Sequence, residues 1–275
     1  MTSDLVTDVK AAAAAGFSGV EIWFRKLDAY LEDHSVDDLK ALFVDNAIAP
    51  AALSSIEFIA FRGDEYQWVK DRCKQLAEIA EHISCPAIAL VASPTPKSHP
   101  DLYYPWEDTA DEYVSVLEEL DDIARPHGVR LGFEFLGFSW CSVRTPKGAM
   151  EIVDRVNREN VGIILDTCHF YGGGGELREI EALDPAKIFT VHINDMEDVP
   201  KEGMTDGKRL MPGDPNGAIP LNAIFQRLKD IGFDGPVAVE LFREEYWSQD
   251  PYDVTQRAYD TSMKALAPYF DVSQL

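Results

Sequence analysis

The sequence predicts an α/β fold, a (β/α)₈ TIM barrel in which helices surround a parallel sheet. Short apolar runs rich in β-branched and aromatic residues alternate with longer helix-like segments along the chain. No linker or change in composition divides the 275 residues. Because barrels of this length are routinely one unit, we expect a single domain over residues 1–275.

Seven strands are readable, each a short apolar run bounded by turn residues. In chain order they are 19–24 (GVEIWF), 48–56 (IAPAALSSI), 86–93 (PAIALVAS), 129–135 (VRLGFEF), 161–166 (VGIILD), 188–195 (IFTVHIND) and 236–242 (PVAVELF). Helix-like segments stand between them, at 11–19, 37–48, 73–84, 116–128, 149–160 and 221–235. This order of elements is typical of a parallel sheet built from β/α units.

The ends of the predicted helices carry suitable residues. Ser35 and the pair Thr145-Pro146 stand where helices begin, and both provide a side-chain oxygen that can accept from a free backbone N–H group. Gly16, Gly128 and Gly232 follow helix ends, where a left-handed backbone favours glycine. These signals support the helix boundaries.

The first predicted element is a helix, whereas a (β/α)₈ barrel begins with a strand and needs eight strands to close. We therefore expect that the first strand of the barrel is absent from the printed sequence and would precede Met1. The alternative is a natural seven-stranded variant, which would leave two unpaired strand edges.

Composition limits the possible partners. The formal net charge of −23 argues against nucleic acid or an anionic membrane surface as a partner. It suits a small neutral substrate, or one whose charge is handled by a metal. The four cysteines form no CxxC pair, and no export signal or membrane span is readable. We expect reduced thiols and a cytoplasmic location, whereas the sequence leaves the oligomeric state open.

Polar residues end four of the buried strands, at the carboxyl edge where barrels place their chemistry. They are Glu134, Asp166, His192 and Glu240. Any one of the acids taken alone suits a structural acid paired with Arg or Lys equally well. Three carboxylates converging in an apolar interior would repel one another unless a cation neutralised them. The set therefore predicts one divalent metal ion, with Mn, Mg, Co and Zn all acceptable.

Three further residues are candidates for contact with substrate. His169 stands three residues after Asp166, in a predicted loop, and a half-exposed loop histidine is the alternative. Arg209 is the only arginine of the loop 207–217 and is nearly as compatible with a surface position. Trp23 ends the first readable strand, and ordinary packing is its alternative role. The glycine run 171–176 lacks a P-loop pattern and predicts a flexible loop.

Several segments resemble, in order, the xylose isomerase-like barrel superfamily of sugar isomerases and epimerases, and within it the inosose isomerase family. They are AYLEDHSVDDLKALF (29–43), IARPHGVRLGFEFLG (123–137), VNRENVGIILDTCHF (156–170), VHINDMEDVP (191–200), RLMPGDPNGAIPL (209–221) and PVAVELFREEYW (236–247). The four-ligand pattern is specific to the superfamily, and the first and last segments to the narrower family. The resemblance covers nearly the whole chain. Two departures are the missing first strand and a loop at 212–217 longer than the usual Pro-Gly-x-Gly.

The resemblance implies one divalent metal, most suitably Mn, bound by Glu134, Asp166, His192 and Glu240, with His169 and Arg209 touching substrate. It also implies an isomerase of inositol catabolism that converts 2-keto-myo-inositol to 1-keto-D-chiro-inositol through an enediolate. Such chemistry needs a base, for which Glu134 and Glu240 are the candidates, and a metal that stabilises the negative oxygen.

Other functions remain compatible with the same residues. A keto-sugar 3-epimerase and a 3-dehydroshikimate dehydratase-type lyase both begin with abstraction of a proton next to a ketone. A barrel that binds an inositol without converting it belongs to a different class. The sequence does not distinguish these, nor does it fix the physiological metal or the stereochemistry of the substrate.

Overall fold

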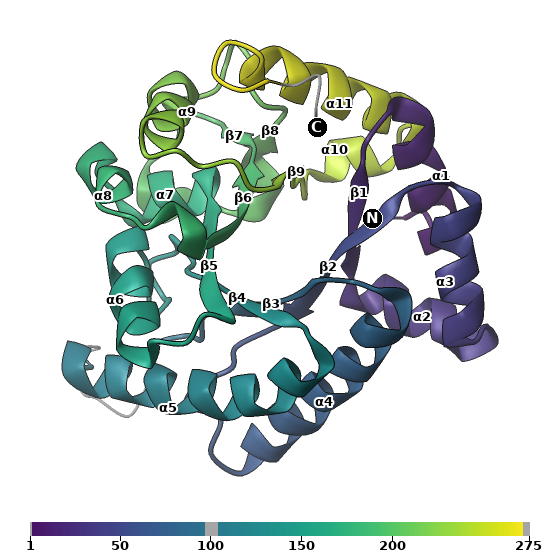
Figure 1. Ribbon diagram of the computed structural model, residues 1–275. Helices are drawn as coiled ribbons and strands as arrows, with labels where there is room; N and C mark the ends of the chain where they lie inside the picture. Colours follow the sequence, from purple (N-terminus) through teal and green to yellow (C-terminus); the bar gives the residue numbers. More distant parts are fainter. Residues whose placement is uncertain (1, 97–103, 272–275) are drawn as a thin grey trace.

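The structure is a computed structural model that describes residues 2–96 and 104–271. Parallel strands form a curved sheet with helices around it, as Figure 1 shows. The neighbours in the seven-stranded sheet, in order, are β1 (Gly19–Trp23), β2 (Ala49–Ile56), β3 (Ala87–Val91), β4 (Arg130–Glu134), β5 (Val161–Asp166), β6 (Ile188–Ile193) and β9 (Val237–Val239). Each of the seven predicted strands has a counterpart, but the last is shorter than the predicted 236–242, because β9 ends at Val239 and Glu240 lies just beyond it.

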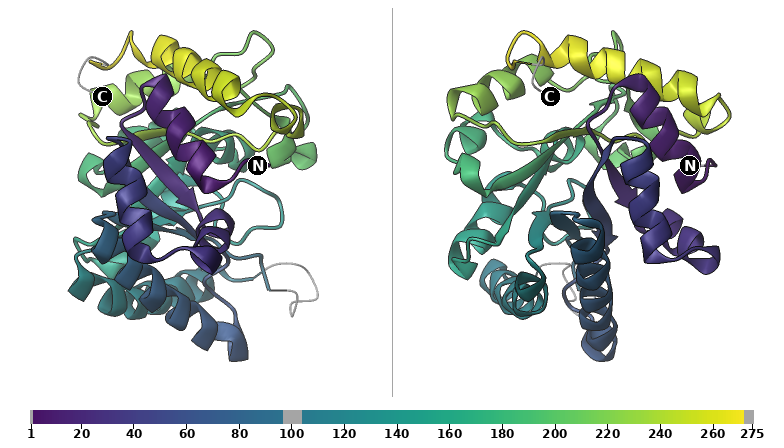
Figure 2. Two further views of the ribbon diagram at one scale, coloured as in Figure 1. Left: turned by 90° about the vertical axis from the view of Figure 1, so that its right-hand side faces the viewer. Right: turned by 45° about the vertical axis from the view of Figure 1, so that its right-hand side comes forward.

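Helices pack on the outside of the sheet and enclose an apolar core (Figures 1 and 2). They are α1 (Leu5–Ala15), α2 (Phe24–Asp33), α3 (Val36–Asp45), α4 (Tyr66–Ile83), α5 (Trp106–Ala124), α6 (Pro146–Val156), α7 (Thr167–Gly173), α8 (Leu177–Glu181), α9 (Leu221–Asp230), α10 (Glu244–Trp247) and α11 (Pro251–Leu266). Short 3₁₀ turns, among them η4 (Lys201–Gly203) and η5 (Asp206–Lys208), interrupt the loops.

The predicted helix caps form as expected. Ser35 caps α3: its hydroxyl accepts from the Asp38 backbone N–H at 3.1 Å, and the Asp38 carboxylate accepts from the Ser35 N–H at 2.8 Å. The Thr145 hydroxyl caps α6 by accepting from the Gly148 N–H at 3.2 Å. These local contacts fix where each helix begins.

The predicted strand over 188–195 was too long. The strand β6 ends at Ile193, and a separate antiparallel pair follows, β7 (Asp195–Met196) with β8 (Arg209–Leu210). The ladder stops before Asn194, whose backbone pairs with a side chain instead: its N–H donates to the Thr167 hydroxyl at 3.1 Å, and its C=O accepts from that hydroxyl at 2.9 Å. As a consequence Arg209 lies on a short strand rather than in an open loop.

The prediction of a flexible loop over 171–176 was also wrong in part. Residues 171–173 form the last part of α7, and Gly174 ends that helix with φ of 78°. The glycines permit close packing: a Cβ atom on Gly173 would lie 1.8 Å from the carbonyl oxygen of Arg144, and one on Gly172 would lie 2.7 Å from the Met204 side chain. The glycine run therefore seats α7 against neighbouring loops.

The sheet ends at β1 and β9, and no ladder joins these two strands within the described residues. We call the space between them the seam. On the outside, α1 and α11 pack against each other across it, as Figure 2 shows in purple and yellow. The phenyl ring of Phe17 meets the ring of Tyr259 edge-on at 5.1 Å. The outer layer of helices is therefore continuous where the inner layer of strands is interrupted.

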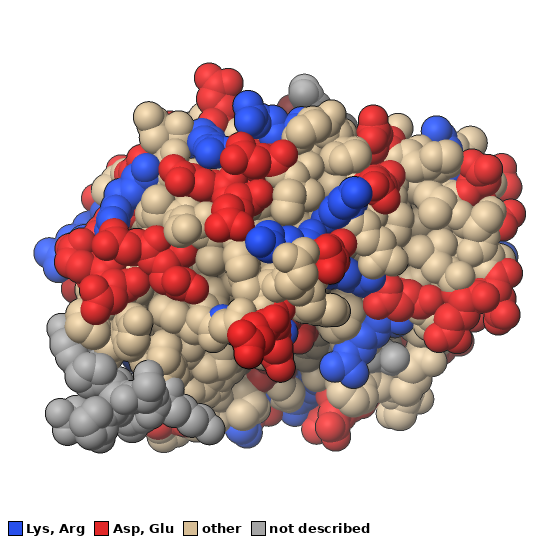
Figure 3. Space-filling model, turned by 90° about the horizontal axis from the view of Figure 1, so that it is seen from below, with Lys and Arg blue, Asp and Glu red and all other residues tan. Residues whose placement is uncertain are grey.

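The structure also bears on the expectations for the cysteines, for a membrane span and for surface charge. All four cysteines are free and buried. Within residues 2–96 and 104–271, no helix combines the length and the apolar character needed to span a bilayer. On the face shown in Figure 3, acidic side chains form larger groups than basic ones. That face is therefore unsuited to a polyanionic partner.

Candidate metal centre

The four polar residues predicted at strand ends come together inside the barrel. Glu134 ends β4, Asp166 ends β5, His192 lies on β6, and Glu240 directly follows β9. Asp166 and His192 are paired in register on adjacent strands. One ligand atom from each of the four residues lies within 4.8 Å of the others. The parallel sheet thus gathers three carboxylates and one imidazole at its carboxyl edge.

Asp166 is held by backbone and side-chain donors. One of its carboxylate oxygens, Oδ1, accepts from the N–H groups of Cys168 at 2.6 Å and His169 at 3.1 Å, and so caps α7. The other oxygen, Oδ2, faces the Arg209 guanidinium at 2.5 Å. Burial alone would raise the pKa of Asp166, but the charges of Arg209, His169 and His192 outweigh it and hold this pKa below its usual range. Asp166 is therefore an ionised, fixed carboxylate.

His192 lies between carboxylates on both sides of its ring. Its Nδ1 is 3.1 Å from Glu134 Oε1 and 3.6 Å from Glu240 Oε2, whereas its Nε2 is 2.9 Å from Glu21 Oε2 on β1. Nδ1 is consequently the ring atom that faces the other candidate ligands. A metal-binding histidine commonly donates its other ring N–H group to a carboxylate that orients the ring, and Glu21 is placed to accept from Nε2–H in this way.

Sequence reasoning did not single out Glu21 as a site residue. The sequence signals for it are a carboxylate inside the otherwise apolar strand GVEIW and its place on the same strand face as the candidate Trp23. Its contact with His192 joins residues 171 positions apart. Such a contact depends on the curvature of the whole sheet, which no local pattern encodes.

Arg209 is buried in the centre of the site, with only 1% of its side chain exposed. Its Nη1 lies 3.0 Å from Glu240 Oε2 as well as contacting Asp166, and its Nη2 lies 2.8 Å from the Asp206 carboxylate. The surface position considered for this arginine is therefore excluded. The guanidinium neutralises part of the negative charge that the carboxylates bring together.

His169 is also buried, and lies on α7 instead of in the predicted loop. Its Nε2 is 3.2 Å from Arg209 Nη2, and its ring meets Phe138 edge-on at 5.1 Å. Burial lowers the pKa of His169, which keeps the ring neutral, so Nε2 accepts from Arg209 and Nδ1 carries the proton. Within the described residues that Nδ1 is buried without a hydrogen-bond partner.

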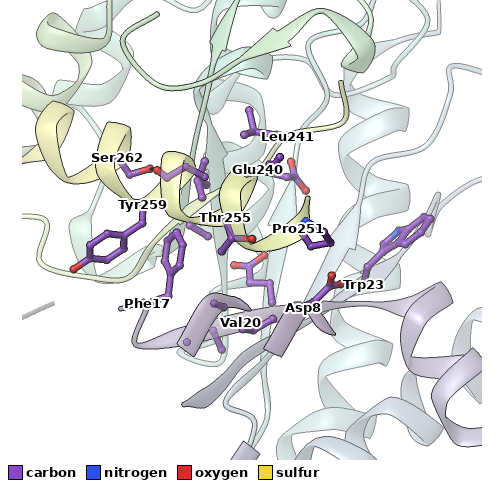
Figure 4. Close-up of a pocket in the computed structure, with 18 of the residues that line it drawn as sticks. Asp8, Phe17, Val20, Trp23, Glu240, Leu241, Pro251, Thr255, Tyr259 and Ser262 are labelled. Carbon is purple, nitrogen blue, oxygen red and sulfur yellow. Dashed lines mark hydrogen bonds between the residues drawn. The ribbon is translucent and has the colours of Figure 1, made fainter. Parts of the chain in front are cut away.

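Trp23 lies further from the four candidate ligands, at the end of β1. It lines a cavity that also reaches Glu21 and Glu240, as Figure 4 shows for Trp23 and Glu240. Its indole meets the Phe24 ring edge-on, with the ring centroids 5.8 Å apart, and the Arg25 guanidinium lies over the indole. Trp23 is thus half-buried and available to a ligand at the rim.

Two groups of the cluster have strongly shifted acidities. Burial raises the pKa of Glu240 to about 8, although the charges of His192 and Arg209 oppose the rise. Burial alone would lower the pKa of His192, but the surrounding glutamates, Glu21 first, raise it well above its usual value. At neutral pH the cluster therefore holds protons that compensate for its negative charge.

The donor set fits a divalent cation. Three carboxylates and one imidazole, with ligand atoms within 4.8 Å of one another, match the ligands that Mn, Co, Zn and Mg accept. In the metal-free site, bound protons and the Arg209 guanidinium balance the negative charge of the carboxylates. A divalent cation would take over part of this role. Glu134, Asp166, His192 and Glu240 are the residues that would bind it.

Comparison with known proteins shows the family of the chain. Residues 9–268 match the family model described as xylose isomerase-like TIM barrel. The chain belongs to this family. The inosose isomerase of Halalkalibacterium halodurans is 36% identical over 270 residues, which cover 98% of this chain and 93% of the relative. The inosose isomerase of Bacillus subtilis is 36% identical over 279 residues, which cover 98% and 95%.

A solved structure is similar over the same length. The crystal structure of the IOLI protein with a bound zinc atom has a TM-score of 0.93 and 36% identity, and the match covers 98% of this chain and 96% of that one. The family and the barrel fold predicted from the sequence motifs are thereby confirmed.

In this member of the family, replacing Glu21 with alanine is expected to lower metal affinity by about 10–100-fold, because His192 loses the partner that orients its ring. Glu21→Gln should have a smaller effect, since an amide oxygen still accepts from Nε2–H. Competition with a chromophoric chelator measures the affinity. Glu32→Ala, at an exposed position of α2, is the matched control. Unchanged affinity in Glu21→Ala would contradict the orienting role.

Metal binding is expected to release protons and to tighten as pH rises. The pKa of Glu240 is raised to about 8 and that of His192 well above its usual value, so both groups hold protons at neutral pH, whereas a metal ligand must lose its proton. Apparent affinity should therefore increase from pH 6 through about 8. Calorimetry in buffers of different ionisation enthalpy counts the protons released. A pH-independent affinity without proton release would contradict the expectation.

Proposed function

We propose that this chain is a metal-dependent inosose isomerase, which moves a keto group between adjacent carbons of an inosose. The observation that carries the proposal is full-length similarity to inosose isomerases at 34–36% identity. The buried cluster of carboxylates supports it, because isomerisation next to a ketone requires a base held close to the reacting carbon.

We assign the proton transfers to Glu134 and Glu240. Burial raises the pKa of Glu240 to about 8 in the metal-free site, and a bound cation would lower it. A glutamate that both binds the ion and takes a proton from carbon would therefore use its second carboxylate oxygen as the base. Glu240 is held in place by Arg209 at 3.0 Å, while Glu134 is held by His192 at 3.1 Å. One glutamate takes the proton from the hydroxyl-bearing carbon next to the keto group, which gives an enediolate. The proton of that carbon's hydroxyl moves to the former keto oxygen, and the same glutamate or the other returns a proton to the former keto carbon.

The remaining site residues support that transfer. A divalent cation at this site would supply Lewis-acid stabilisation of the negative charge that develops on the substrate oxygen. Arg209 keeps Asp166 ionised and screens the repulsion between the carboxylates. The Nδ1–H group of His169 is proposed as a donor to a substrate oxygen, and Trp23 as an apolar wall for the ring.

For the metal itself we propose Mn, because two glutamates and an aspartate make the site rich in oxygen ligands, which suit Mn better than thiolate-preferring ions. The similar IOLI structure holds zinc, so zinc is the principal alternative. Turnover measured with the metal-free protein reloaded separately with Mn, Co, Zn and Mg ranks them. Highest turnover with Zn would overturn the assignment of Mn.

The reaction is tested by NMR of 2-keto-myo-inositol incubated with the metal-loaded protein in heavy water. We expect 1-keto-D-chiro-inositol as product, with deuterium at the carbon that receives the proton. Deuterium incorporation with inverted configuration at a ring carbon would instead identify an epimerase, and loss of water would identify a lyase. Tight binding of the inosose without any exchange would leave a binding protein and refute the enzymatic proposal.

A further inference from the structure

Glu57 is a charged side chain outside the candidate metal centre. It directly follows β2 at the carboxyl edge of the sheet and is half-buried. Among the described residues it has neither a hydrogen-bond nor an ion-pair partner. By contrast, the buried acids Asp121 and Asp166 each pair with an arginine. Because it is unfavourable to withdraw a carboxylate from water without a partner, the place of Glu57 is not explained by stability.

The strand register directs this side chain toward the interior of the barrel. Val91 of β3 pairs with Glu134 of β4 and therefore shares its inward face. Ile56 of β2 pairs with Leu90, the neighbour of Val91, so both lie on the opposite, outward face, where they are fully buried. Since side chains alternate along a strand, the residue after Ile56 points inward, on the same side as Glu134.

Glu57 and Glu134 lie on either side of β3. The strands β2 and β4 are its two neighbours in the sheet (Figure 1), which places their backbones about 10 Å apart, or two strand spacings. A six-membered ring with its hydroxyl groups can span this distance between two inward side chains. Glu57 is therefore placed to contact a different part of a ligand from the part that Glu134 contacts.

The segment that carries Glu57 is held in an unusual conformation. Phe58 and Phe61 both have φ of 59°, in the left-handed region that bulky residues rarely adopt. The buried Ser93 hydroxyl fixes the residue between them: it accepts from the Ala60 N–H at 2.9 Å and donates to the Ala60 C=O at 2.8 Å. Backbone held in such conformations by its neighbours is concentrated at ligand sites.

Aromatic rings continue from this segment to the candidate metal centre. Phe58 meets the Trp140 ring edge-on, with the ring centroids 5.9 Å apart. Trp140 stacks on Phe138 at 5.3 Å, and Phe138 in turn meets His169. Trp140 is 44% exposed despite its apolar ring. Apolar walls with a few polar groups in fixed places are typical of small-molecule sites. A carboxylate beside exposed rings suits a cyclic polyol, whose C–H groups pack on a ring while its hydroxyls donate to the carboxylate.

We propose that Glu57 is a specificity residue that accepts hydrogen bonds from hydroxyl groups of a cyclic polyol, on the side of the ring away from the reacting carbons. Trp140 packs against the same ring. The inference rests on the proposed function, in which Glu134 and Glu240 serve the keto carbon and its neighbour. The remaining hydroxyls then need acceptors, because a hydroxyl left without a partner in the site is costly. Hydrogen bonds to a carboxylate are stronger than those to a neutral acceptor.

The test is calorimetric binding of myo-inositol, which has no keto group, to the metal-loaded full chain. Glu57→Ala should bind it about 10–100-fold more weakly than the parent protein, and Glu57→Gln, which keeps one acceptor oxygen, should lose less. The temperature of thermal unfolding should not fall in either variant, because no partner of Glu57 is left unpaired. Glu78→Ala, at an exposed position of α4, is the matched control and should bind as the parent does.

Monodeoxy derivatives of myo-inositol separate a direct contact from a general disturbance of the site. The parent protein should bind at least one derivative about tenfold more weakly than myo-inositol or weaker still, and Glu57→Ala should bind that derivative and myo-inositol equally. Unchanged affinity in Glu57→Ala, or discrimination that persists in it at every ring position, would overturn the inference. Failure of the parent protein to bind any of these polyols would also overturn it. Binding without conversion of 2-keto-myo-inositol would refute only the isomerase activity.

Discussion

Replacing Glu240 with glutamine is expected to lower turnover of 2-keto-myo-inositol by about 10²–10⁴-fold. The amide keeps the shape of the side chain but cannot take a proton from carbon or return it, so one of the two glutamates assigned to proton transfer is lost. Because Glu240 is also a proposed metal ligand, turnover is compared at metal concentrations that saturate the variant. Deuterium exchange into the substrate should fall in parallel with turnover.

Glu244→Gln is the matched control for this substitution. Glu244 is exposed on α10, four positions along the chain, so its replacement tests any general effect of losing a negative charge near the site. We expect it to leave turnover within about twofold of the parent protein, as surface substitutions usually do. Full turnover in metal-saturated Glu240→Gln would exclude Glu240 from proton transfer and leave Glu134 as the only candidate.

Replacing Arg209 with methionine is expected to destabilise the metal-free protein by about 3–5 kcal/mol, because it leaves buried carboxylates without their partner. Asp166 is fully buried, and the arginine that faces it is 1% exposed, so solvent cannot take over this role. Added metal should recover a large part of the loss, since the cation supplies positive charge to the same carboxylates. Urea unfolding with and without metal measures both values.

Arg227→Met provides the comparison for Arg209. Arg227 pairs with Glu181 on the surface, with 34% and 50% of the two side chains exposed, and its loss should cost less than about 1 kcal/mol. If Arg209→Met lowered the free energy of unfolding as little as Arg227→Met does, water or protonation of the buried carboxylates would be compensating for the missing arginine. An equal loss with and without metal would mean that the cation does not share these carboxylates.

The sequence was sufficient to predict the candidate site residues that stand at the carboxyl ends of strands. Glu134, Asp166, His192 and Glu240 were recognisable because a polar residue at the end of an apolar run is conspicuous, and the parallel sheet brings such positions together. Their roles as ligands remain predictions. The position of Arg209 was not predictable, because it depends on the two-residue pairing of β7 with β8, which is too short to leave a pattern.

Contacts across the barrel were the other limit. The interaction of Glu21 with His192, and the packing of α7 that turned a predicted glycine loop into helix, both depend on elements distant in sequence. Periodicity reports which face of one element is buried, but not which residue of another element it meets. The seam was foreseen only as a missing strand, and its apolar helical walls required the structure.

The placement of the four candidate ligands has a mechanical consequence for the sheet. Three of them belong to the interior strands β4, β5 and β6, while Glu240 follows β9, the strand at the free end of the sheet. A cation bound by all four residues would connect β9, at the end of the sheet, to the interior strands β4, β5 and β6. Metal binding would then raise the free energy of local opening of β9. The ion proposed to assist the reaction would also keep Glu240 in its place in the site.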